Sequence, residues 1–225
     1  MLEKNGKLFK LLGMEVNQSS PENYQSAKRM DTQMRREQIA AAALSLIGQA
    51  GLEGLSIVGI ATEVGLVPSA IYRHFSGKAA IIDAVNELIS ERLLGIVRHV
   101  CDEETDPIAQ LRMLLTLHIN LIKTNNGIPR YIFSSEVATD SSGRNHQLYT
   151  TVQRYLEKVA AIIRVGQHTG RIRPELEANI LAYMFLGLLQ PAIFLNHLSD
   201  GQFDIETETQ RAWQVFSQSI LATAD

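Results

Sequence analysis

Helical periodicity of the apolar residues constrains this chain more than any other feature of its sequence. From Asp31 onward, apolar side chains recur at intervals of three and four residues, which places them on one face of successive helices. In the first such segment the apolar positions are Ile39, Ala42, Ala43, Leu46, Ile47 and Ala50. Asp31 or Thr32 is the expected N-cap of this helix, and Gly51 is a natural residue just after its end. No segment alternates like a strand, so the sequence predicts an all-α protein of about nine helices.

The most apolar segment runs from Ile180 to Leu195, in a predicted helix that opens at Pro174. It is sixteen residues long and contains Gln190 and Pro191. A helix that spans a bilayer needs about 20 apolar residues. Residues 1–30 also lack an apolar segment followed by a small-residue cleavage site. We therefore expect a soluble, cytoplasmic protein with no membrane partner.

Composition argues against several kinds of site. Cys101 is the one cysteine among 225 residues, which excludes an internal disulfide framework and a multi-cysteine zinc site. The six histidines are scattered, and there is neither a glycine-rich phosphate loop nor a nucleophile elbow. We expect no metal, no cofactor and no enzyme activity. An all-α enzyme and a helical interaction module without DNA binding are kept as alternatives.

Charge is distributed unevenly along the chain. Residues 1–30 carry five basic and three acidic side chains, whereas residues 79–225 carry twelve basic and seventeen acidic ones. An acidic bulk with a less acidic N-terminal end suits a protein that contacts an anion at one end only. Residues 1–30, which include a polar stretch with a proline, are predicted to be a flexible arm.

Two short predicted helices with a glycine between them are typical of a helix-turn-helix. Ser56 can cap the first helix, which ends at Val64, and Gly65 can supply a positive φ in the turn. Pro68 suits the first turn of the second helix, which is expected to run to about Phe75. This arrangement presents the outer face of the second helix to the major groove of DNA.

The sequence of this hairpin carries a family resemblance. The residues concerned are Ile39–Leu46, Gly51–Ser56, Ile60-Ala61-Thr62-Glu63-Val64-Gly65-Leu66 and Ile71-Tyr72-Arg73-His74-Phe75-Ser76-Gly77-Lys78. Over about residues 33–82 the chain resembles the DNA-binding domain of the tetracycline-repressor (TetR/AcrR-like) family of bacterial regulators, whereas the remainder matches in length and helical layout. The resemblance implies a helix-turn-helix domain over residues 31–78 and a helical effector-binding and dimerisation domain over residues 79–225. The implied function is that of a ligand-responsive transcriptional regulator, a repressor that a small lipophilic effector releases from its operator.

The same resemblance implies a set of DNA contacts. Phosphate contacts fall on Tyr72, His74 and Lys78. Base-reading positions fall on Val58, Pro68, Ser69, Ala70 and Arg73. Among these, Ser69 and Arg73 can form hydrogen bonds to a base edge, and the apolar residues can contact thymine methyl groups. Val67 stands where the family has a Ser or Thr cap. Four basic residues near the first helix could reach a flanking phosphate or the minor groove, and Arg36 is the preferred contact among Lys28, Arg29, Arg35 and Arg36.

An effector cavity is expected in the C-terminal domain, because the family's helices enclose one there. His118 lies on an apolar stripe, where it is either a core histidine with a partner or a polar group of the cavity. The predicted lining is apolar and aromatic with a few polar tips: Leu115, His118, Ile119, Ile122, Tyr131, Phe133, Tyr149, Tyr155 and Phe185. It contains no evident carboxylate, so we expect a lipophilic effector that is neutral or weakly acidic.

A homodimer is expected from the helix of residues 180–195. This helix is apolar on nearly every side, and one small domain can bury only part of such a surface. Gly187 would permit close helix approach, and the helix from Ile205 to Leu221 would contribute Trp213 and Phe216 to a four-helix bundle of two copies. The twofold axis would set two recognition helices about one DNA turn apart.

Overall fold

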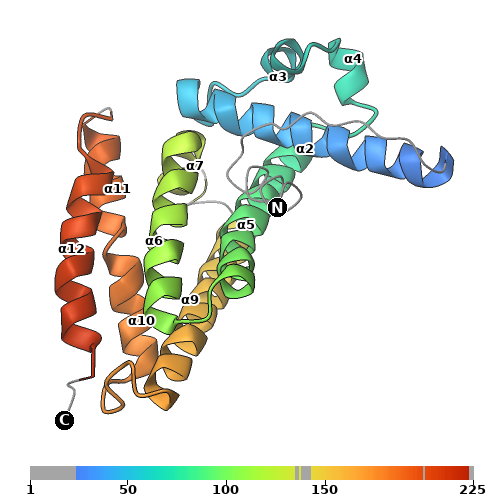
Figure 1. The fold of residues 1–225 in the computed structure, drawn as a ribbon. Coiled ribbons are helices and arrows are strands. Elements are labelled where there is room, and N and C mark those ends of the chain that lie inside the picture. Colours follow the sequence, from blue (N-terminus) through green and yellow to red (C-terminus); the bar gives the residue numbers. More distant parts are fainter. Residues whose placement is uncertain (1–23, 135–136, 138–142, 200, 223–225) are drawn as a thin grey trace. The chain divides into compact units, whose positions relative to one another are not determined.

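A computed structural model describes residues 24–134, 137, 143–199 and 201–222. These residues are almost entirely helical (Figure 1), and their one extended pairing is an isolated bridge between Ile172 and Leu221. The all-α prediction is confirmed. The helices of this part of the chain are α2 (Tyr24–Ala50), α3 (Ile57–Val64), α4 (Pro68–Ile71), α5 (Lys78–Glu103), α6 (Pro107–Thr124), α7 (Gly127–Ile132), α9 (Arg144–His168), α10 (Ala178–Gly187), α11 (Gln190–Leu198) and α12 (Ile205–Ile220).

The chain forms two compact units. The first unit holds the residues up to Arg92 together with Thr124–Leu148, and the second holds Leu93–Lys123 together with the residues from Tyr149 onward. The first unit thus contains α2, α3, α4, α7 and the N-terminal half of α5. The second contains α6, most of α9, and α10, α11 and α12.

Two glycines let α2 and α7 meet at backbone distance inside the first unit. A Cβ atom on Gly127 would lie 1.9 Å from the carbonyl oxygen of Leu44. A Cβ atom on Gly48 would lie 2.9 Å from the backbone nitrogen of Gly127. The start of α9 is fixed to α5 in the same unit, because Arg144 Nε donates to Asp83 Oδ1 at 2.7 Å.

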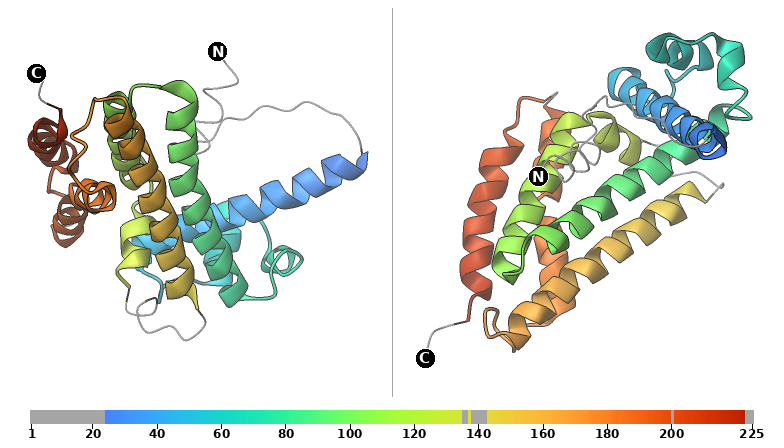
Figure 2. Two further views of the ribbon diagram at one scale, coloured as in Figure 1. Left: turned by 90° about the horizontal axis from the view of Figure 1, so that it is seen from below. Right: turned by 45° about the vertical axis from the view of Figure 1, so that its right-hand side comes forward.

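In the second unit α9 lies beside α6 and the C-terminal half of α5, and α10, α11 and α12 stand together (Figures 1 and 2). Phe185 of α10 is fully buried against Trp213 and Phe216 of α12, with ring centroids 6.4 and 6.2 Å apart. Lys123 at the end of α6 forms an ion pair of 2.7 Å with Glu206 at the start of α12. This aromatic cluster is part of the core of the second unit.

Two helix starts differ from the sequence prediction. Helix α2 already begins at Tyr24, inside the segment predicted as an arm, so Asp31 and Thr32 do not cap it. Residues 1–23 lie outside the described part of the chain. Helix α10 begins at Ala178 rather than near Pro174, because the Glu177 carboxylate accepts hydrogen bonds from the Asn179 and Ile180 nitrogens at 3.0 Å and caps the helix.

The predicted apolar helix of residues 180–195 is two helices, α10 and α11, separated at Leu188–Leu189. Pro191 has no N–H to continue the helix, and its ring would clash with the carbonyl of Gly187. This break raises the number of helices in the described residues to ten. By length and apolar composition alone, Ala178–Leu198 would suffice to cross a membrane. Of its most apolar 18 residues, 39% are buried inside the protein.

Candidate nucleic-acid interface

The predicted helix-turn-helix is formed by α3 and α4, and its two punctuating residues act as the sequence indicates. Ser56 caps α3 by accepting a hydrogen bond from the Gly59 nitrogen at 3.1 Å. Gly65 ends α3 with a φ of 70°, and the next nitrogen, of Leu66, donates to the Ala61 oxygen at 2.8 Å. A positive φ at this position favours glycine strongly. These local bonds fix the angle at which α4 leaves α3.

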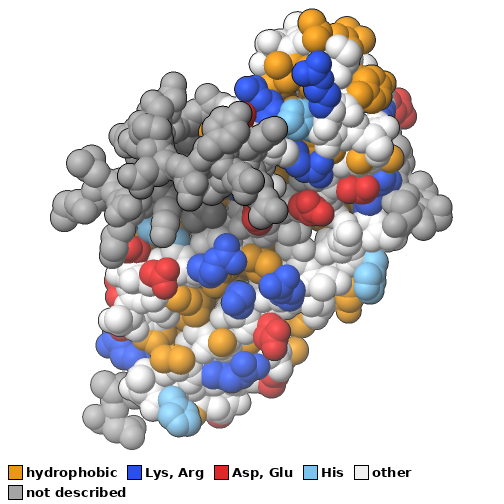
Figure 3. All heavy atoms as spheres, turned by 90° about the vertical axis from the view of Figure 1, so that its right-hand side faces the viewer, with side chains coloured by type: hydrophobic (Ala, Val, Ile, Leu, Met, Phe, Trp, Pro, Cys, Tyr) orange, Lys and Arg blue, Asp and Glu red, His pale blue; other side chains and the backbone are white. Residues whose placement is uncertain are grey.

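Burial divides the hairpin into an inner and an outer side. Ile60, Ala61, Ile71 and Phe75 are at most 3% exposed and hold the hairpin on its unit. On the outer side, Val58 is 64% and Tyr72 58% exposed. The other exposed positions that we predicted to contact DNA are Pro68, Ser69 and Arg73, whereas Ala70 is half-buried. The upper end of the face in Figure 3, which carries α3 and α4, accordingly combines Lys, Arg, His and apolar side chains.

Arg36 is engaged inside the first unit, and its role as a DNA contact stays a prediction. Its guanidinium carbon lies 4.1 Å above the centroid of the Phe75 ring, and Nη1 donates to the carbonyl oxygen of His74. A guanidinium stacked on an aromatic face and bonded to a carbonyl is held in one orientation. Arg36 therefore positions the segment that follows α4 against α2.

His74 and Lys78 are half-buried, and each has one side turned toward the protein. Lys78 Nζ donates to the Leu52 oxygen at 3.2 Å, which leaves its other two N–H groups for a phosphate. The Nδ1 atom of His74 is buried and has no partner among the described residues. Because a buried N–H without an acceptor is costly, we assign the proton to Nε2, which can then donate outward.

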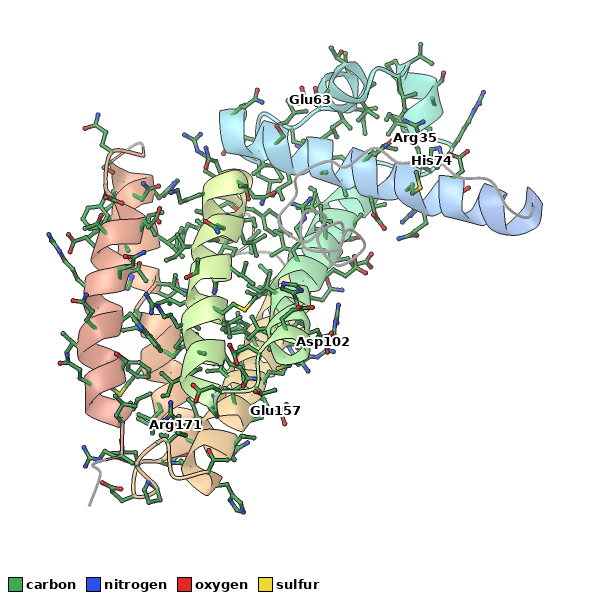
Figure 4. The ribbon with its side chains drawn as sticks, viewed as in Figure 1. Arg35, Glu63, His74, Asp102, Glu157 and Arg171 are labelled. Carbon is green, nitrogen blue, oxygen red and sulfur yellow. The ribbon has the colours of Figure 1, made fainter. Side chains whose placement is uncertain are left out.

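One further charged residue near this surface, Glu63, escaped the sequence prediction, which includes Arg35 among the basic residues near the first helix. Figure 4 labels Arg35 on α2, next to Arg36, and Glu63 on α3. Glu63 is exposed, and one residue before it the exposed Thr62 donates to the Val58 oxygen at 3.0 Å. A carboxylate here would repel phosphate, and it can accept a hydrogen bond from the amino group of cytosine. Thr62 lies about one helical turn after Val58, and this spacing is the sequence signal that would have placed Thr62 on the same exposed face.

The first turn of α4 forms without a side-chain cap. Val67 occupies the N-cap with φ −86° and ψ 148°, an extended conformation, and Pro68 follows at the first helical position. Helix α4 has only four residues and continues as turns rather than as the longer helix predicted to Phe75. Proline therefore starts this helix in place of the hydroxyl group that the family pattern provides.

Replacing Val67 with threonine should stabilise the protein by about 0.5–1 kcal/mol. Val67 is 63% exposed and already has N-cap backbone geometry, so an isosteric hydroxyl can accept a hydrogen bond from the first turn without displacing core atoms. Urea unfolding at fixed protein concentration measures the gain. Val67→Ala, which adds no acceptor, is the control. A threonine variant no more stable than the alanine variant would show that α4 needs no cap.

The residues predicted to line an effector cavity fall into distinct places. His118 and Tyr155 meet in the core of the second unit, with His118 Nδ1 3.2 Å from the Tyr155 hydroxyl oxygen and the rings edge-to-face. Leu115, Ile119 and Ile122 are buried on the same helix as His118. Burial lowers the pKa of the His118 imidazole to about 4 and raises the pKa of the Tyr155 phenol. Both groups are therefore neutral hydrogen-bonding groups at pH 7.

Four other aromatic residues of that prediction lie elsewhere. Phe133 and Tyr149 are 42% and 60% exposed, which contradicts a role as buried lining. Tyr131 is fully buried, and it belongs with Phe133 to the first unit. Phe185 packs in the aromatic cluster of α10 and α12. Aromatic content alone could not distinguish these environments.

The predicted dimer residues lie in two different environments. Trp213 and Phe216 are 8% and 4% exposed because they pack on Phe185, so their side chains are core rather than surface. Gly187 is exposed, and a Cβ atom there would meet nothing within 4 Å. The exposed large apolar residues of α10, α11 and α12 are Ile180, Tyr183, Met184, Phe194, Leu195, Leu198 and Val215.

Comparisons with known proteins agree with this architecture. Residues 39–85 match the family model described as bacterial regulatory proteins, tetR family, and residues 86–219 match that of the YsiA-like protein, C-terminal region. The chain is 26% identical over 193 residues to the nucleoid occlusion factor SlmA of Vibrio vulnificus strain YJ016. That alignment covers 83% of this chain and 95% of the relative.

Solved structures share the fold. The regulator FadR of Bacillus halodurans matches with a TM-score of 0.70 at 18% identity, over 81% of this chain and 94% of its own. A tetR-family regulator from Agrobacterium tumefaciens matches with a TM-score of 0.71 at 17% identity, over 85% of this chain and all (100%) of its own. FadR of Bacillus subtilis, solved with stearoyl-CoA, matches with a TM-score of 0.67 at 18% identity, over 81% of this chain and 98% of its own.

The two family models together span the helix-turn-helix and nearly all of the following helices. Proteins of this family are soluble regulators that bind operator DNA, and they are not enzymes. The chain belongs to the tetR family of bacterial regulatory proteins and is a DNA-binding transcription regulator.

Proposed function

We propose that this protein is a cytoplasmic, homodimeric repressor without enzyme activity, which a small lipophilic effector releases from its operator. In this proposal residues 31–78 bind DNA, and residues 79–225 hold the effector site and the dimer surface. No metal or other cofactor takes part. The observation that carries the proposal is the outer side of α3 and α4, where Tyr72, Ser69 and Arg73 are exposed while the hairpin core is closed.

The chemistry of that outer side fits duplex DNA. Tyr72 and Lys78 can donate to phosphate oxygens, which sets the register of the protein on the helix. Arg73 can donate to guanine, and Ser69 can form a hydrogen bond with several bases. Val58 and Pro68 offer apolar contact to thymine methyl groups. Arg36 supports these contacts by fixing the backbone at His74.

A second copy of the chain is the proposed partner of the apolar surface on α10, α11 and α12. Ile180, Tyr183 and Met184 on α10 are each at least 50% exposed, and Leu198 and Val215 are 63% and 71% exposed. So many large exposed apolar side chains on three neighbouring helices are more typical of an interface than of free protein surface. Gly187 has open space around it, which permits the helix of a second copy to approach closely. Twofold symmetry would then present two recognition helices to two half-sites.

The proposed effector is lipophilic and neutral or weakly acidic. His118 and Tyr155 are an uncharged polar pair among the apolar residues Leu115, Ile119 and Ile122. Such a pair can hold the carbonyl or hydroxyl group of an apolar molecule. FadR of Bacillus subtilis, which shares the fold, was solved with stearoyl-CoA, so long-chain fatty acids are the first effectors to test, and their acyl-CoA esters are tested beside them.

Release of DNA tests the proposed function. The purified protein is bound to fluorescent duplexes taken from the region upstream of its own gene, and acyl-CoA and other lipophilic compounds are added. We expect tight binding to at least one duplex and its loss with an effector that also raises the melting temperature of the protein. The effector must favour the DNA-free conformer by a few kcal/mol, because equal affinity for both conformers shifts nothing. Binding that no compound relieves would argue against ligand control.

Removing single phosphate contacts should weaken operator binding without changing sequence preference. We expect Tyr72→Phe and Lys78→Ala each to cost roughly 1–2 kcal/mol, and Lys78→Ala to lower the slope of log affinity against log salt by about one. Fluorescence anisotropy at several salt concentrations measures both effects. Lys123→Ala is the matched control, since Lys123 is an exposed lysine of the second unit. If both hairpin variants bind like the wild type, α4 does not lie in the groove.

Nucleoid occlusion is a second candidate function, because the relatives with 22–26% identity over 83–84% of this chain carry the name SlmA. That identity is too low to assign their role. Mapping the chromosomal sites occupied by the protein separates the two functions. A repressor should occupy a few promoters and leave them when the effector is present, whereas sites spread over the chromosome and indifferent to effector would favour the second candidate.

A further inference from the structure

Arg92 is a charged residue of the first unit whose side chain is buried. It lies on α5 and is only 8% exposed. Its Nη1 atom donates to the side-chain oxygen of Asn125, a neutral acceptor, and its Nε atom is buried without a partner among the described residues. A guanidinium has five N–H donors and does not lose its charge in proteins. Arg92 therefore has donors directed into the protein that the described residues do not use.

Glu37 on α2 acts electrostatically on Arg92, but it does not fully compensate the buried charge of Arg92. Burial lowers the pKa of Arg92, and the negative charge of Glu37 only partly opposes this effect. None of the ion pairs in the described part of the chain includes Arg92. A buried charge is normally tolerated only where a close counter-charge and hydrogen bonds compensate its lost hydration. Within the described part of the chain, the folded protein thus keeps a positive charge without a close counter-charge.

The neighbouring positions on the same helices are apolar. Val85 and Ile89, about two turns and one turn before Arg92 on α5, are 0% and 3% exposed. Ala40, one turn after Glu37 on α2, is 2% exposed. A strongly hydrated ion such as inorganic phosphate would lose its water there, whereas an oxyanion on an apolar molecule brings its own apolar surface.

We propose that Arg92 is the binding site for the carboxylate or phosphate group of an amphiphilic ligand, which takes the unused donors of the guanidinium. A planar guanidinium with parallel N–H groups binds such oxyanions with two hydrogen bonds. The ligand competes with Glu37 and Asn125 for Arg92. This inference deepens the proposed function, on which its regulatory consequence rests, because it names an anionic amphiphile as an effector and gives it a contact inside the first unit.

Ligand binding at Arg92 would affect DNA binding because of the position of Glu37. Its neighbour in sequence, Arg36, holds the His74 carbonyl and the Phe75 ring at the end of the recognition segment. A ligand anion that draws Arg92 away from Glu37 therefore acts on the same turn of α2 that positions this segment, within one compact unit. Binding of the anion and binding of DNA are then coupled, and each must weaken the other by the same factor.

Calorimetry on the DNA-free protein tests the site directly. The probes are dodecanoate, stearoyl-CoA, the uncharged dodecanol and inorganic phosphate. We expect Arg92→Gln to weaken dodecanoate or stearoyl-CoA binding about 10- to 100-fold, because hydrogen bonds to a charged group are lost. Dodecanol should bind both proteins alike, and phosphate alone should bind at least about 100-fold more weakly than dodecanoate. Dodecyl phosphate, which has the same chain length as dodecanoate, is compared with it to tell a carboxylate ligand from a phosphate ligand.

Two further variants separate a ligand site from a structural role. Arg92→Lys keeps the charge but loses the paired donors, so it should bind the anionic probe with intermediate affinity. Glu37→Gln removes the competing carboxylate and should tighten anion binding severalfold. A merely structural Arg92 would show neither effect. Thermal unfolding of each variant confirms that it is folded.

The inference is overturned if neither anionic probe binds the wild type, if Arg92→Gln binds both like the wild type, or if Glu37→Gln weakens them. It is also overturned if inorganic phosphate binds as tightly as dodecanoate. Operator binding without any probe is measured separately. A protein that binds the probes through Arg92 but no DNA would refute the proposed function and leave the anion site standing.

Discussion

Gly127→Ala is expected to lower the free energy of unfolding by about 3 kcal/mol, an effect at the upper end for an overpacked site. The added Cβ atom would lie 1.9 Å from the Leu44 carbonyl oxygen and 2.9 Å from its carbonyl carbon. Both atoms are backbone of a long helix and cannot rotate away as a side chain could. Helices α2 and α7 must therefore separate, and the contact that ties α7 to the DNA-binding helices is lost.

Urea unfolding at constant protein concentration measures this change, since the proposed dimer would make the measured stability depend on concentration. Gly77→Ala is the matched control. Gly77 directly precedes α5, much as Gly127 begins α7, and a Cβ atom on Gly77 would meet nothing within 4 Å. We expect the control to stay within about 0.5 kcal/mol of the wild type. Equal stability of the two alanine variants would contradict the close approach of α2 and α7.

Met184→Glu is expected to weaken the dimer and operator binding by about 100-fold or more. Met184 is 50% exposed in the single chain, so the substitution should leave the fold of each copy intact. In the proposed dimer the glutamate would be buried in an apolar surface without a partner, and twofold symmetry would bring in a second one. A single copy reaches one half-site only, so operator affinity should fall with the dimer.

Sedimentation measures the dimer, and fluorescence anisotropy measures the operator affinity. Met34→Glu is the control for the dimer measurement, because Met34 is 52% exposed and belongs to the first unit. It should sediment like the wild type. A Met184→Glu protein that is still dimeric at low micromolar concentration would exclude α10 from the interface.

Local signals in the sequence predicted the helix-turn-helix well. A serine cap and a glycine with positive φ act within a few residues, so Ser56 and Gly65 could be assigned before any tertiary contact was known. Apolar spacing likewise predicted the helices, because each needs one buried face. Pro191 was visible in the sequence, but the apolar run around it masked the break between α10 and α11.

Properties that depend on which surfaces meet could not be predicted in this way. The apolar stripe of α12 did not tell whether Trp213 faces the core of its own chain or a second copy. The basic character of Arg36 suggested a phosphate partner, whereas the structure gives it the Phe75 ring and a carbonyl oxygen. Nothing local distinguished exposed Tyr149 from buried Tyr155. The need for glycine at position 127 arises from Leu44, which is distant in sequence.

The central claim, that the outer side of α3 and α4 reads operator DNA, is tested most directly by selection of duplexes from a random library with the purified protein. We predict enrichment of a palindromic sequence whose half-sites are about one helical turn, or a multiple of it, apart. The wild type should bind the selected duplex at least about 1,000-fold more tightly than random DNA, and a Tyr72→Phe, Arg73→Ala double variant should lose that preference. The account is contradicted if no sequence is enriched, or if the double variant selects the same sequence with the same affinity.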